Sequence, residues 1–201
     1  MNTKTMGFAL ALAGAAAAQS TYTIDGSHSS AQFSVKHMMI SNVKGEFTAV
    51  AGTVAYDPKN PAASKIDATI DVNSINTREP KRDAHLKSAD FFDTAKYPAM
   101  TFHSTQAWRS GSTIKVKGNL TMHGVTKEVV LDVDGPTAEA RDPWGNLRIG
   151  ATATAKLNRK DWGLTWNQAL EAGGVLVGEE VAITLDIEAI KVAPASKMSS
   201  N

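Results

Sequence analysis

Apolar and polar residues alternate with a period of two along most of this chain, and this pattern constrains its fold more than any other feature. Residues 149–157 are the clearest case, and their apolar members are Ile149, Ala151, Ala153, Ala155 and Leu157. Alternation of this kind is typical of a β-strand that buries one face. The same pattern recurs in residues 29–37, 66–73, 114–122, 125–133 and 181–188.

Short turn sequences separate these segments. Residues 57–61 read DPKNP, residues 142–146 read DPWGN, and His123-Gly124 is a candidate for a tight hairpin. Short turns imply that consecutive strands run antiparallel. Because closure removes exposed strand edges, we predict an all-β fold, an antiparallel barrel of about eight strands. A β-sandwich is the alternative fold.

Residues 82–102, RDAHLKSADFFDTAKYPAMTF, break the alternation. Pro80 suits the first turn of a helix, and Asp83 lies near the N-terminus, where the helix dipole favours an acid. We therefore predict one short helix over residues 80–89. The pair Phe91-Phe92 follows it and needs an apolar surface to cover. In an all-β chain, this surface is expected to be the open end of a barrel or the gap between two sheets.

The first residues carry the features of a secretory signal. Lys4 precedes an apolar run over residues 6–18 that ends in small residues. The run is shorter than the roughly 20 residues of a membrane-spanning helix, so we predict a cleaved signal peptide, residues 1–18, and a location in the periplasm or outside the cell. A membrane anchor is the alternative. The remainder is expected to form one barrel domain, residues 19–192, and a disordered tail, residues 193–201.

Composition and charge argue against several kinds of chemistry and partner. The chain contains no cysteine, which rules out disulfides, thiol catalysis and cysteine-ligated zinc. Its 21 lysines and arginines balance 20 aspartates and glutamates, so no charge excess favours nucleic acid or an anionic membrane surface as a partner. We therefore expect neither nucleic-acid binding nor a stable membrane span. A homodimer stays open.

The titratable residues form no recognisable catalytic or metal-binding motif. The five histidines lack neighbours at metal-ligand spacing, and the GxSxG motif of serine hydrolases is absent. The densest titratable group is Arg82, Asp83, His85, Asp90 and Asp93. A ligand head-group site or an acid–base cluster is one interpretation; we favour an aspartate that caps backbone amides and an Arg82 paired with a carboxylate. We predict no catalytic residue, no metal and no cofactor.

The inward face of the predicted strands is rich in alanine. Its members are Ala31, Ala68, Ala151, Ala153 and Ala155, and Ala49 and Ala51 are assigned to it as well. A collapsed core would favour larger residues, because each buried methylene contributes about 0.8 kcal/mol. An eight-stranded barrel either fills with its own side chains or holds one small ligand. We predict a cavity with hydrocarbon walls that takes a long apolar guest; a core filled by aromatic rings is the alternative.

Five segments carry a resemblance to a known family. They are YTIDGSHSSAQFSVKH at 22–37, YDPKNP at 56–61, RDAHLKSADFFDTAKYPAMTF at 82–102, LTMHGVTKEV at 120–129 and LNRKDWGL at 157–164. On these segments the chain resembles the YceI-like family. The resemblance implies a lipocalin-like eight-stranded barrel around a lengthwise apolar tunnel that holds a polyisoprenoid in the periplasm. It implies no catalytic residues, and the shared positions Arg82, His85, Phe91, Phe92 and 161–163 look architectural.

We therefore predict a non-enzymatic protein that binds, stores or transports a long isoprenoid-type lipid in a barrel tunnel. The predicted tunnel wall comprises Phe33, Val35, Phe47, Ile70, Phe92, Phe102, Val116, Leu120, Ala151, Ala153, Leu157, Trp162, Trp166, Ile183 and Leu185. One alternative is an enzyme acting on an apolar substrate, in which loss of His85 abolishes turnover. The other is a filled-core barrel that serves as a protein-interaction module.

Overall fold

The computed structural model describes residues 19–171 and 173–193, so the predicted signal peptide and all but the first residue of the predicted tail lie outside the described residues. The strands are β1 (Ser20–Ile24), β2 (Ser30–His37), β3 (Ser41–Phe47), β4 (Val50–Tyr56), β5 (Lys65–Asp71), β6 (Ile75–Asn76), β7 (Ala99–Ser110), β8 (Thr113–Met122), β9 (Val125–Asp134), β10 (Ala140–Arg141), β11 (Leu147–Asn158) and β12 (Val177–Lys191). The helices are α1 (Pro80–Lys87) and the short 3₁₀ helices η1 (Pro61–Ala63), η2 (Val72–Ser74) and η3 (Arg159–Trp162).

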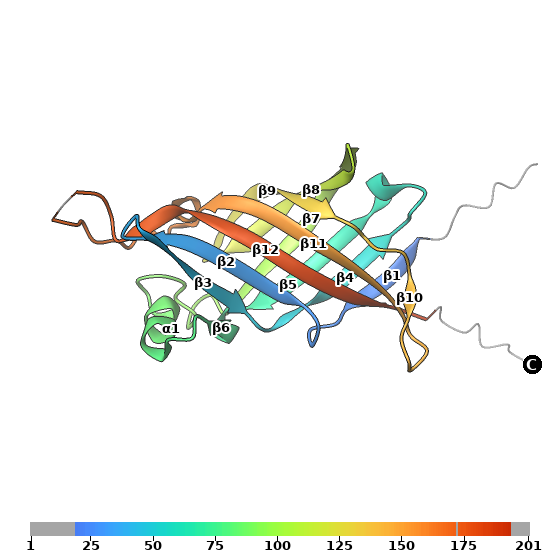
Figure 1. The fold of residues 1–201 in the computed structure, drawn as a ribbon, viewed down its shortest axis with the longest axis horizontal. Coiled ribbons are helices and arrows are strands. Elements are labelled where there is room, and N and C mark those ends of the chain that lie inside the picture. The colour runs from blue at the N-terminus through green and yellow to red at the C-terminus, as the bar shows by residue number, and fades with distance from the viewer. Residues whose placement is uncertain (1–18, 172, 194–201) are drawn as a thin grey trace, which may run out of the picture.

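Eight strands of the described chain form a closed antiparallel ring in the order β11-β9-β8-β7-β5-β4-β1-β12, and the pairing of β12 with β11 closes it (Figure 1). The other edge of β12 pairs with β2 near its beginning and with β1 near its end. β3 then pairs with β2 and extends the wall beyond the ring. The predicted eight-stranded antiparallel barrel is therefore confirmed, and the sandwich alternative is wrong.

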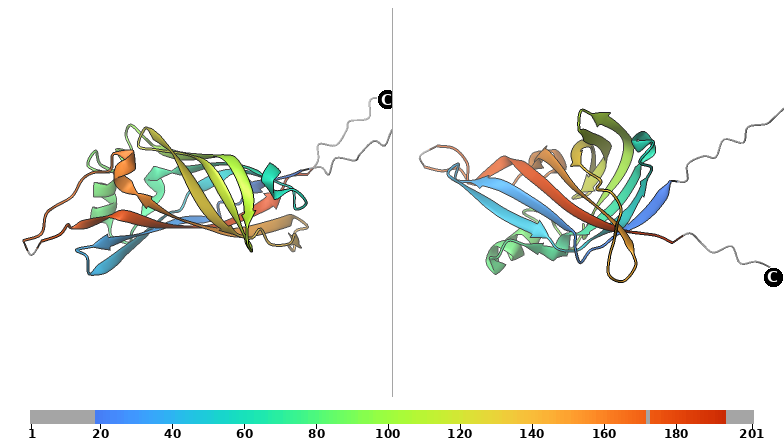
Figure 2. Two further views of the ribbon diagram at one scale, coloured as in Figure 1. Left: turned by 90° about the horizontal axis from the view of Figure 1, so that it is seen from above. Right: turned by 45° about the vertical axis from the view of Figure 1, so that its right-hand side comes forward.

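The two ends of the barrel differ. The beginning of β1 and the end of β12 lie side by side at one end, where Tyr22 pairs with Lys191 (Figures 1 and 2). α1, β6 and the turn between β2 and β3 lie at the other end (Figure 1). Because β12 runs from one end of the barrel to the other, the position of a residue along β12 shows how far it lies from each end.

A break between β3 and β4 changes which residues face inward. β3 and β4 are separated at Thr48 and Ala49, where the Ser74 side chain accepts a hydrogen bond from the Ala49 amide at 3.1 Å. The inward positions therefore pass from Phe47 to Val50, and the predicted inward placement of Ala49 and Ala51 is wrong because both are exposed. The break arises where the chain changes partners, since β3 pairs with β2 and β6 whereas β4 pairs with β1 and β5.

The helix predicted over residues 80–89 is present as α1, which ends two residues earlier. The side chain of Glu79 accepts a hydrogen bond from the Lys81 amide at 3.2 Å and caps the N-terminus. The expected pairing of Arg82 with a carboxylate is wrong: Arg82 donates to the side-chain and carbonyl oxygens of Thr77, both at 2.8 Å. Asp83 accepts from the same Thr77, so these contacts fix the entry into α1. No helix among the described residues is long and apolar enough to cross a membrane.

The hairpin predicted at His123-Gly124 is confirmed. Met122 pairs with Val125, and the two residues between them have φ angles of 51° and 72°. Two successive positive φ angles are the geometry of a type I′ turn, which glycine adopts at little cost. The His123 Nδ1 atom lies 3.0 Å from the carbonyl oxygen of Trp162, so this hairpin is also tied to η3.

Candidate functional site

A cavity of about 280 Å³ lies inside the barrel. Its wall is hydrocarbon except for a few residues, and it comprises Ile24, Ala31, Gln32, Phe33, Val35, Phe47, Val50, Val54, Ile66, Ala68, Ile70, Leu86, Phe91, Phe92, Met100, Thr101, Phe102, Leu120, Met122, Val129, Leu131, Val133, Pro136, Ile149, Gly150, Ala151, Ala153, Ala155, Leu157, Arg159, Leu164, Val177, Val181, Ile183, Leu185, Ile187 and Ala189. The volume is close to the lower end of the range for ligand sites, about 300–1,000 Å³.

The cavity is long and narrow. Its wall residues on β12 run from Val177 to Ala189, which is about 40 Å of extended strand. Strands in a barrel tilt by about 40° from its axis, so the cavity follows about 30 Å of that axis. A small volume over this length suits a single extended chain rather than a compact ligand.

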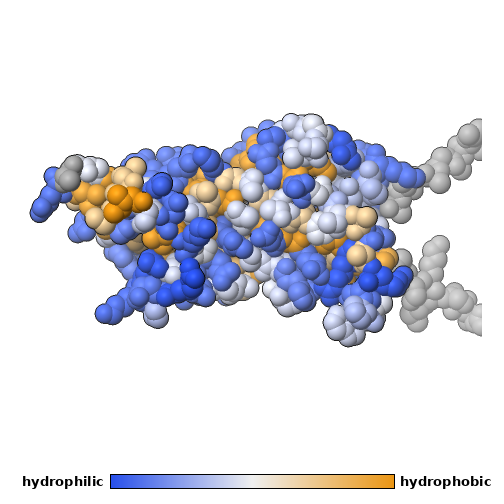
Figure 3. Space-filling view, viewed as in Figure 1, coloured by the Kyte–Doolittle hydropathy of each residue, from blue (hydrophilic) through white to orange (hydrophobic). Residues whose placement is uncertain are grey.

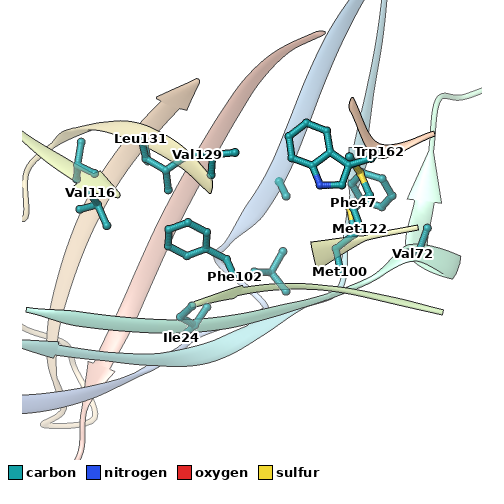
Figure 4. Close-up of a cluster of buried hydrophobic side chains, with 14 of the residues drawn as sticks. Ile24, Phe47, Val72, Met100, Phe102, Val116, Met122, Val129, Leu131 and Trp162 are labelled. Atoms are coloured by element: carbon teal, nitrogen blue, oxygen red, sulfur yellow. The ribbon is translucent and has the colours of Figure 1, made fainter. Parts of the chain in front are cut away.

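The phenylalanine rings lie along the wall because glycines on neighbouring strands make room for them. A side chain on Gly45 would overlap the ring of Phe33, and one on Gly118 would overlap the ring of Phe102. Figure 4 shows Phe102 between a cluster that contains Phe47 and Trp162 and another that contains Val116 and Leu131. The rings therefore fill the space above the glycines and leave a lumen open.

Aromatic side chains gather at the end of the barrel beside α1. Phe47 stacks edge-on against Phe92, with ring centroids 5.7 Å apart. His85, Phe91 and Trp166 form a second group of rings with centroid distances of 4.8–5.1 Å. His85 Nε2 lies 2.9 Å from Asp90 Oδ2, which accounts for its polar edge. The Phe91-Phe92 pair therefore packs on the apolar interior at one end of the barrel, as predicted.

The structure places most of the predicted tunnel residues at the cavity wall. They are Phe33, Val35, Phe47, Ile70, Phe92, Phe102, Leu120, Ala151, Ala153, Leu157, Ile183 and Leu185. Their contact with a guest stays a prediction.

Three predicted wall residues lie elsewhere. Val116 is buried in the core but is not part of the cavity wall. Trp162 is 2% exposed, and its indole N–H donates to the Leu120 carbonyl at 3.2 Å, which holds the ring in the core beneath η3. Trp166 packs on Phe91 and is not part of the cavity wall. The left-handed conformation of Gly163 ends η3 between the two tryptophans.

Sequence reasoning missed Arg159, a charged residue on the cavity wall. The signal was present: inward positions on β11 are odd-numbered from Ile149 to Leu157, and the next odd position is 159. The residue was overlooked because a charged side chain is not expected on a hydrocarbon face.

Asp25, His28 and Glu188 offer ligand atoms within 4.8 Å of one another at the end opposite α1. Arg148 Nη1 already lies 2.7 Å from Asp25 and 2.5 Å from Glu188, and Arg148 Nε lies 2.8 Å from Asp142. Hydrogen bonds from Ser27, Arg148 and His28 hold the pKa of Asp25 well below its usual range. Because arginine supplies the positive charge, we interpret the group as an ion-pair network that ties the strand ends together.

An exposed apolar turn lies at the α1 end, between β2 and β3. It consists of Met38, Met39 and Ile40, and Ile40 is 78% exposed. The Met38 amide donates to the Leu176 carbonyl at 2.8 Å, so the turn lies beside the loop that precedes β12. Figure 3 shows hydrophobic surface gathered at this end. The turn adjoins the cavity wall, because Val35 and Val177 on the wall lie within a few residues of it.

Comparison with known proteins agrees with this architecture. The profile of the YceI-like domain matches residues 22–189. A UPF0312 protein of Pectobacterium atrosepticum is 41% identical over 78% of this chain and 81% of its own length, and Protein YceI of Salmonella newport is 35% identical over 95% and 99%.

Solved structures show the same fold. A YceI protein of Campylobacter jejuni has a TM-score of 0.65 at 32% identity and covers 79% of this chain and 90% of its own. A domain of Saccharophagus degradans described as polyisoprenoid-binding has a TM-score of 0.63 at 18% identity and covers 85% of this chain and 98% of its own. The chain therefore belongs to the YceI-like family.

Proposed function

We propose that this protein is a non-enzymatic carrier or store for one long isoprenoid-type lipid. The observation that carries the proposal is the long, narrow cavity with hydrocarbon walls inside a closed barrel. The likeness in fold to a polyisoprenoid-binding domain supports the choice of ligand class. Phe33 and Phe102 pack against glycines and leave the lumen open, which disfavours the filled-core alternative.

The hydrophobic effect supplies the affinity for a guest taken from water. Each methylene removed from water contributes about 0.8 kcal/mol, so an isoprene unit of five carbons contributes on the order of 4 kcal/mol. The same tail in a bilayer is already out of water, because lipid tails are as apolar as leucine side chains. The tail therefore has a similar free energy in a membrane and in the tunnel, which allows exchange between the two.

We place this exchange in the periplasm, as the signal-like residues 1–18 suggest, and assign the entrance to the end that carries the apolar turn. Met38, Met39 and Ile40 project from this end and continue the apolar wall outward. A turn that inserts into a bilayer would give the lipid tail a path that avoids water. The opposite end carries the ion-pair network around Arg148, and such a charged surface is poorly suited to entering hydrocarbon.

Ala153→Phe tests the proposal. Ala153 is 7% exposed and faces the cavity from β11, so a phenyl ring there occupies the lumen. We expect the affinity for farnesol to fall at least tenfold, as measured by displacement of a fluorescent apolar probe. Thr154→Phe, on the outer face of the same strand, is the matched control and should bind as the wild type does. Unchanged binding in Ala153→Phe, with the native circular dichroism spectrum, would place the guest outside the cavity.

An enzyme acting on an apolar substrate is the second candidate. Its catalytic group would be His85, which lies beside Asp90. Turnover of a bound isoprenoid that His85→Ala abolishes would favour the enzyme, whereas recovery of the unchanged lipid from the protein favours carriage.

A further inference from the structure

Arg159 is the charged residue of the cavity wall within the described part of the chain. It is the first residue of η3 and is 5% exposed. Leu164 and Val177 accompany it on the wall, so its guanidinium lies at the end where β12 begins. Burial of a charge costs free energy unless the charge is paired. Its presence beside a site for an apolar guest therefore needs a physical reason.

Neutral backbone oxygens hold the guanidinium in place. Nε donates to the Gly178 carbonyl at 2.9 Å, Nη2 donates to the Val177 carbonyl at 3.3 Å, and Nη1 donates to the Leu164 carbonyl. A guanidinium has five N–H groups, so these three bonds leave one N–H on each terminal nitrogen. The two remaining N–H groups lie on the two terminal nitrogens, and a pair of guanidinium N–H groups can donate to two oxygens of one anion.

No described carboxylate forms an ion pair with Arg159. Glu179 is the acid nearest to it along β12, and its carboxylate lies 2.5 Å from Lys160 Nζ on the outside of the barrel. Burial lowers the pKa of Arg159, and the charge of Glu179 acts in the opposite direction. Arginine nevertheless stays protonated in proteins. The carbonyl oxygens orient this positive charge without neutralising it.

We propose that Arg159 binds the head group of the guest, and that this head group is an anion, a phosphate or a carboxylate at the end of the isoprenoid chain. The proposal rests on the proposed function, because it names one end of the lipid that the tunnel carries. A guanidinium binds either anion through two parallel N–H groups. Transfer of the tail from a membrane changes its free energy little. Selectivity for one lipid over another therefore depends on the contact between Arg159 and the head group.

The rest of the barrel supports this orientation of the guest. The head group would lie beside the apolar turn at the proposed entrance, and the tail would extend toward Ile187 and Ala189. The opposite end carries three carboxylates, those of Asp25, Asp142 and Glu188, around the single arginine Arg148. These carboxylates repel an anion, so the reversed orientation is disfavoured.

Paired ligands with one chain and two head groups test the inference. We expect wild-type protein to bind farnesyl phosphate about 10- to 100-fold more tightly than farnesol, the size expected for hydrogen bonds to a charged group. Arg159→Gln should remove this preference, so that the variant binds farnesyl phosphate and farnesol equally. Lys160→Gln is the matched control: it removes the same charge one residue away, from a side chain that points outward to Glu179, and should keep the preference.

A second pair of ligands, palmitate and hexadecanol, separates the two anions. A preference for palmitate that Arg159→Gln removes assigns the site to carboxylates as well as phosphates. If the protein prefers farnesyl phosphate over farnesol but does not prefer palmitate over hexadecanol, the head group is restricted to phosphate. Both results support an anion site at Arg159.

The wild-type protein provides a test that needs no variant to fold. The second ionisation of a phosphate has a pKa near 6, so affinity for farnesyl phosphate should rise between pH 5 and pH 7 while affinity for farnesol stays constant. Equal binding of farnesol and farnesyl phosphate, or a preference that survives in a folded Arg159→Gln protein, would overturn the head-group assignment and leave carriage intact. Failure to bind any of these chains would instead contradict the proposed function.

Discussion

At the scale of single residues, the open lumen depends on glycines that lie under aromatic rings. Gly45 lies opposite Phe33 in the pairing of β3 with β2, and the ring occupies the position where a side chain on Gly45 would be. Glycine is unfavourable in a strand because it contributes no side chain to packing. Here the ring of the neighbouring strand supplies that packing, and the barrel axis stays free.

Gly45→Ala should narrow the lumen. The new methyl group overlaps only side-chain atoms of Phe33 and Thr77, so the ring must turn toward the axis. We expect a loss of about 1–3 kcal/mol in the free energy of unfolding, the usual cost of overpacking, and weaker binding of farnesol. Gly150→Ala is the control: Gly150 borders the cavity only through its backbone, since its neighbours Ile149 and Ala151 hold the inward positions, and a methyl group there meets only the Ile187 carbonyl oxygen at 3.7 Å. Denaturant titration and probe displacement measure the two effects; unchanged farnesol binding would mean that Phe33 does not border the guest.

The sequence pattern predicts individual wall residues well where alternation is regular. Ala151, Ala153 and Leu157 follow one strand with one set of partners, and all three line the cavity. Trp162 could not be placed, because its position depends on a hydrogen bond to Leu120, a residue distant in sequence. Arg159 lies at an inward position of the alternation, but a charged residue is not expected on an apolar wall, so it was not predicted there.

At the scale of elements, the apolar turn between β2 and β3 has backbone geometry that an apolar residue rarely adopts. Met38 and Met39 have φ angles of 51° and 63°, a region where asparagine and glycine are favoured. A methionine at such a position has two free-energy costs: an unfavourable backbone conformation and an apolar side chain exposed to solvent. A contact with a bilayer accounts for both costs.

The double variant Met39→Asn/Ile40→Ser should slow lipid transfer. Asparagine tolerates the left-handed backbone at position 39, so the fold should persist. We expect the rate of isoprenoid uptake from phosphatidylcholine vesicles to fall on the order of tenfold, since two apolar side chains no longer enter the bilayer. Trp144→Ser, in a turn at the opposite end and 79% exposed, should leave the rate unchanged. An equal fall in the uptake rate of both variants would contradict the assignment of the entrance to the apolar turn.

The network around Arg148 predicts a dependence of stability on pH. Burial raises the pKa of Asp142, but hydrogen bonds from Arg148 and Asn146 outweigh it and lower the pKa to about 2. A carboxylate with a lowered pKa stabilises the fold above its unfolded value of about 3.9 and loses this contribution as the pH falls through the folded value. Tm should therefore fall between pH 4 and pH 2. Arg148→Gln should flatten this decline, and parallel curves for the two proteins would show that the network contributes nothing.

Elements formed by local rules were predictable, whereas those set by distant pairing were not. The sequence around Pro80 predicts α1 because helix-start residues are local signals. The break at Thr48 and Ala49 arises from the exchange of strand partners between β3 and β4. Alternation within the segment carries no record of that exchange, so the inward assignment of Ala49 and Ala51 failed.

At the scale of the whole molecule, the barrel joins a closed sheet, an apolar interior and two unlike mouths. Closure satisfies the backbone hydrogen bonds of the ring, so the interior needs no polar groups to complete them. The alternation predicts this closed sheet but cannot distinguish a hollow interior from a filled one. That difference depends on the direction of rings such as Phe33 and Phe102, which tertiary packing decides.

If the interior holds an apolar chain, the mass of the intact protein should reveal it directly. Protein exported to the periplasm of a bacterial host, purified without detergent and measured by native mass spectrometry, should carry the mass of one lipid per chain, which organic extraction removes. Protein that stays at its bare polypeptide mass, both as purified and after incubation with isoprenoid-containing vesicles, would contradict the claim.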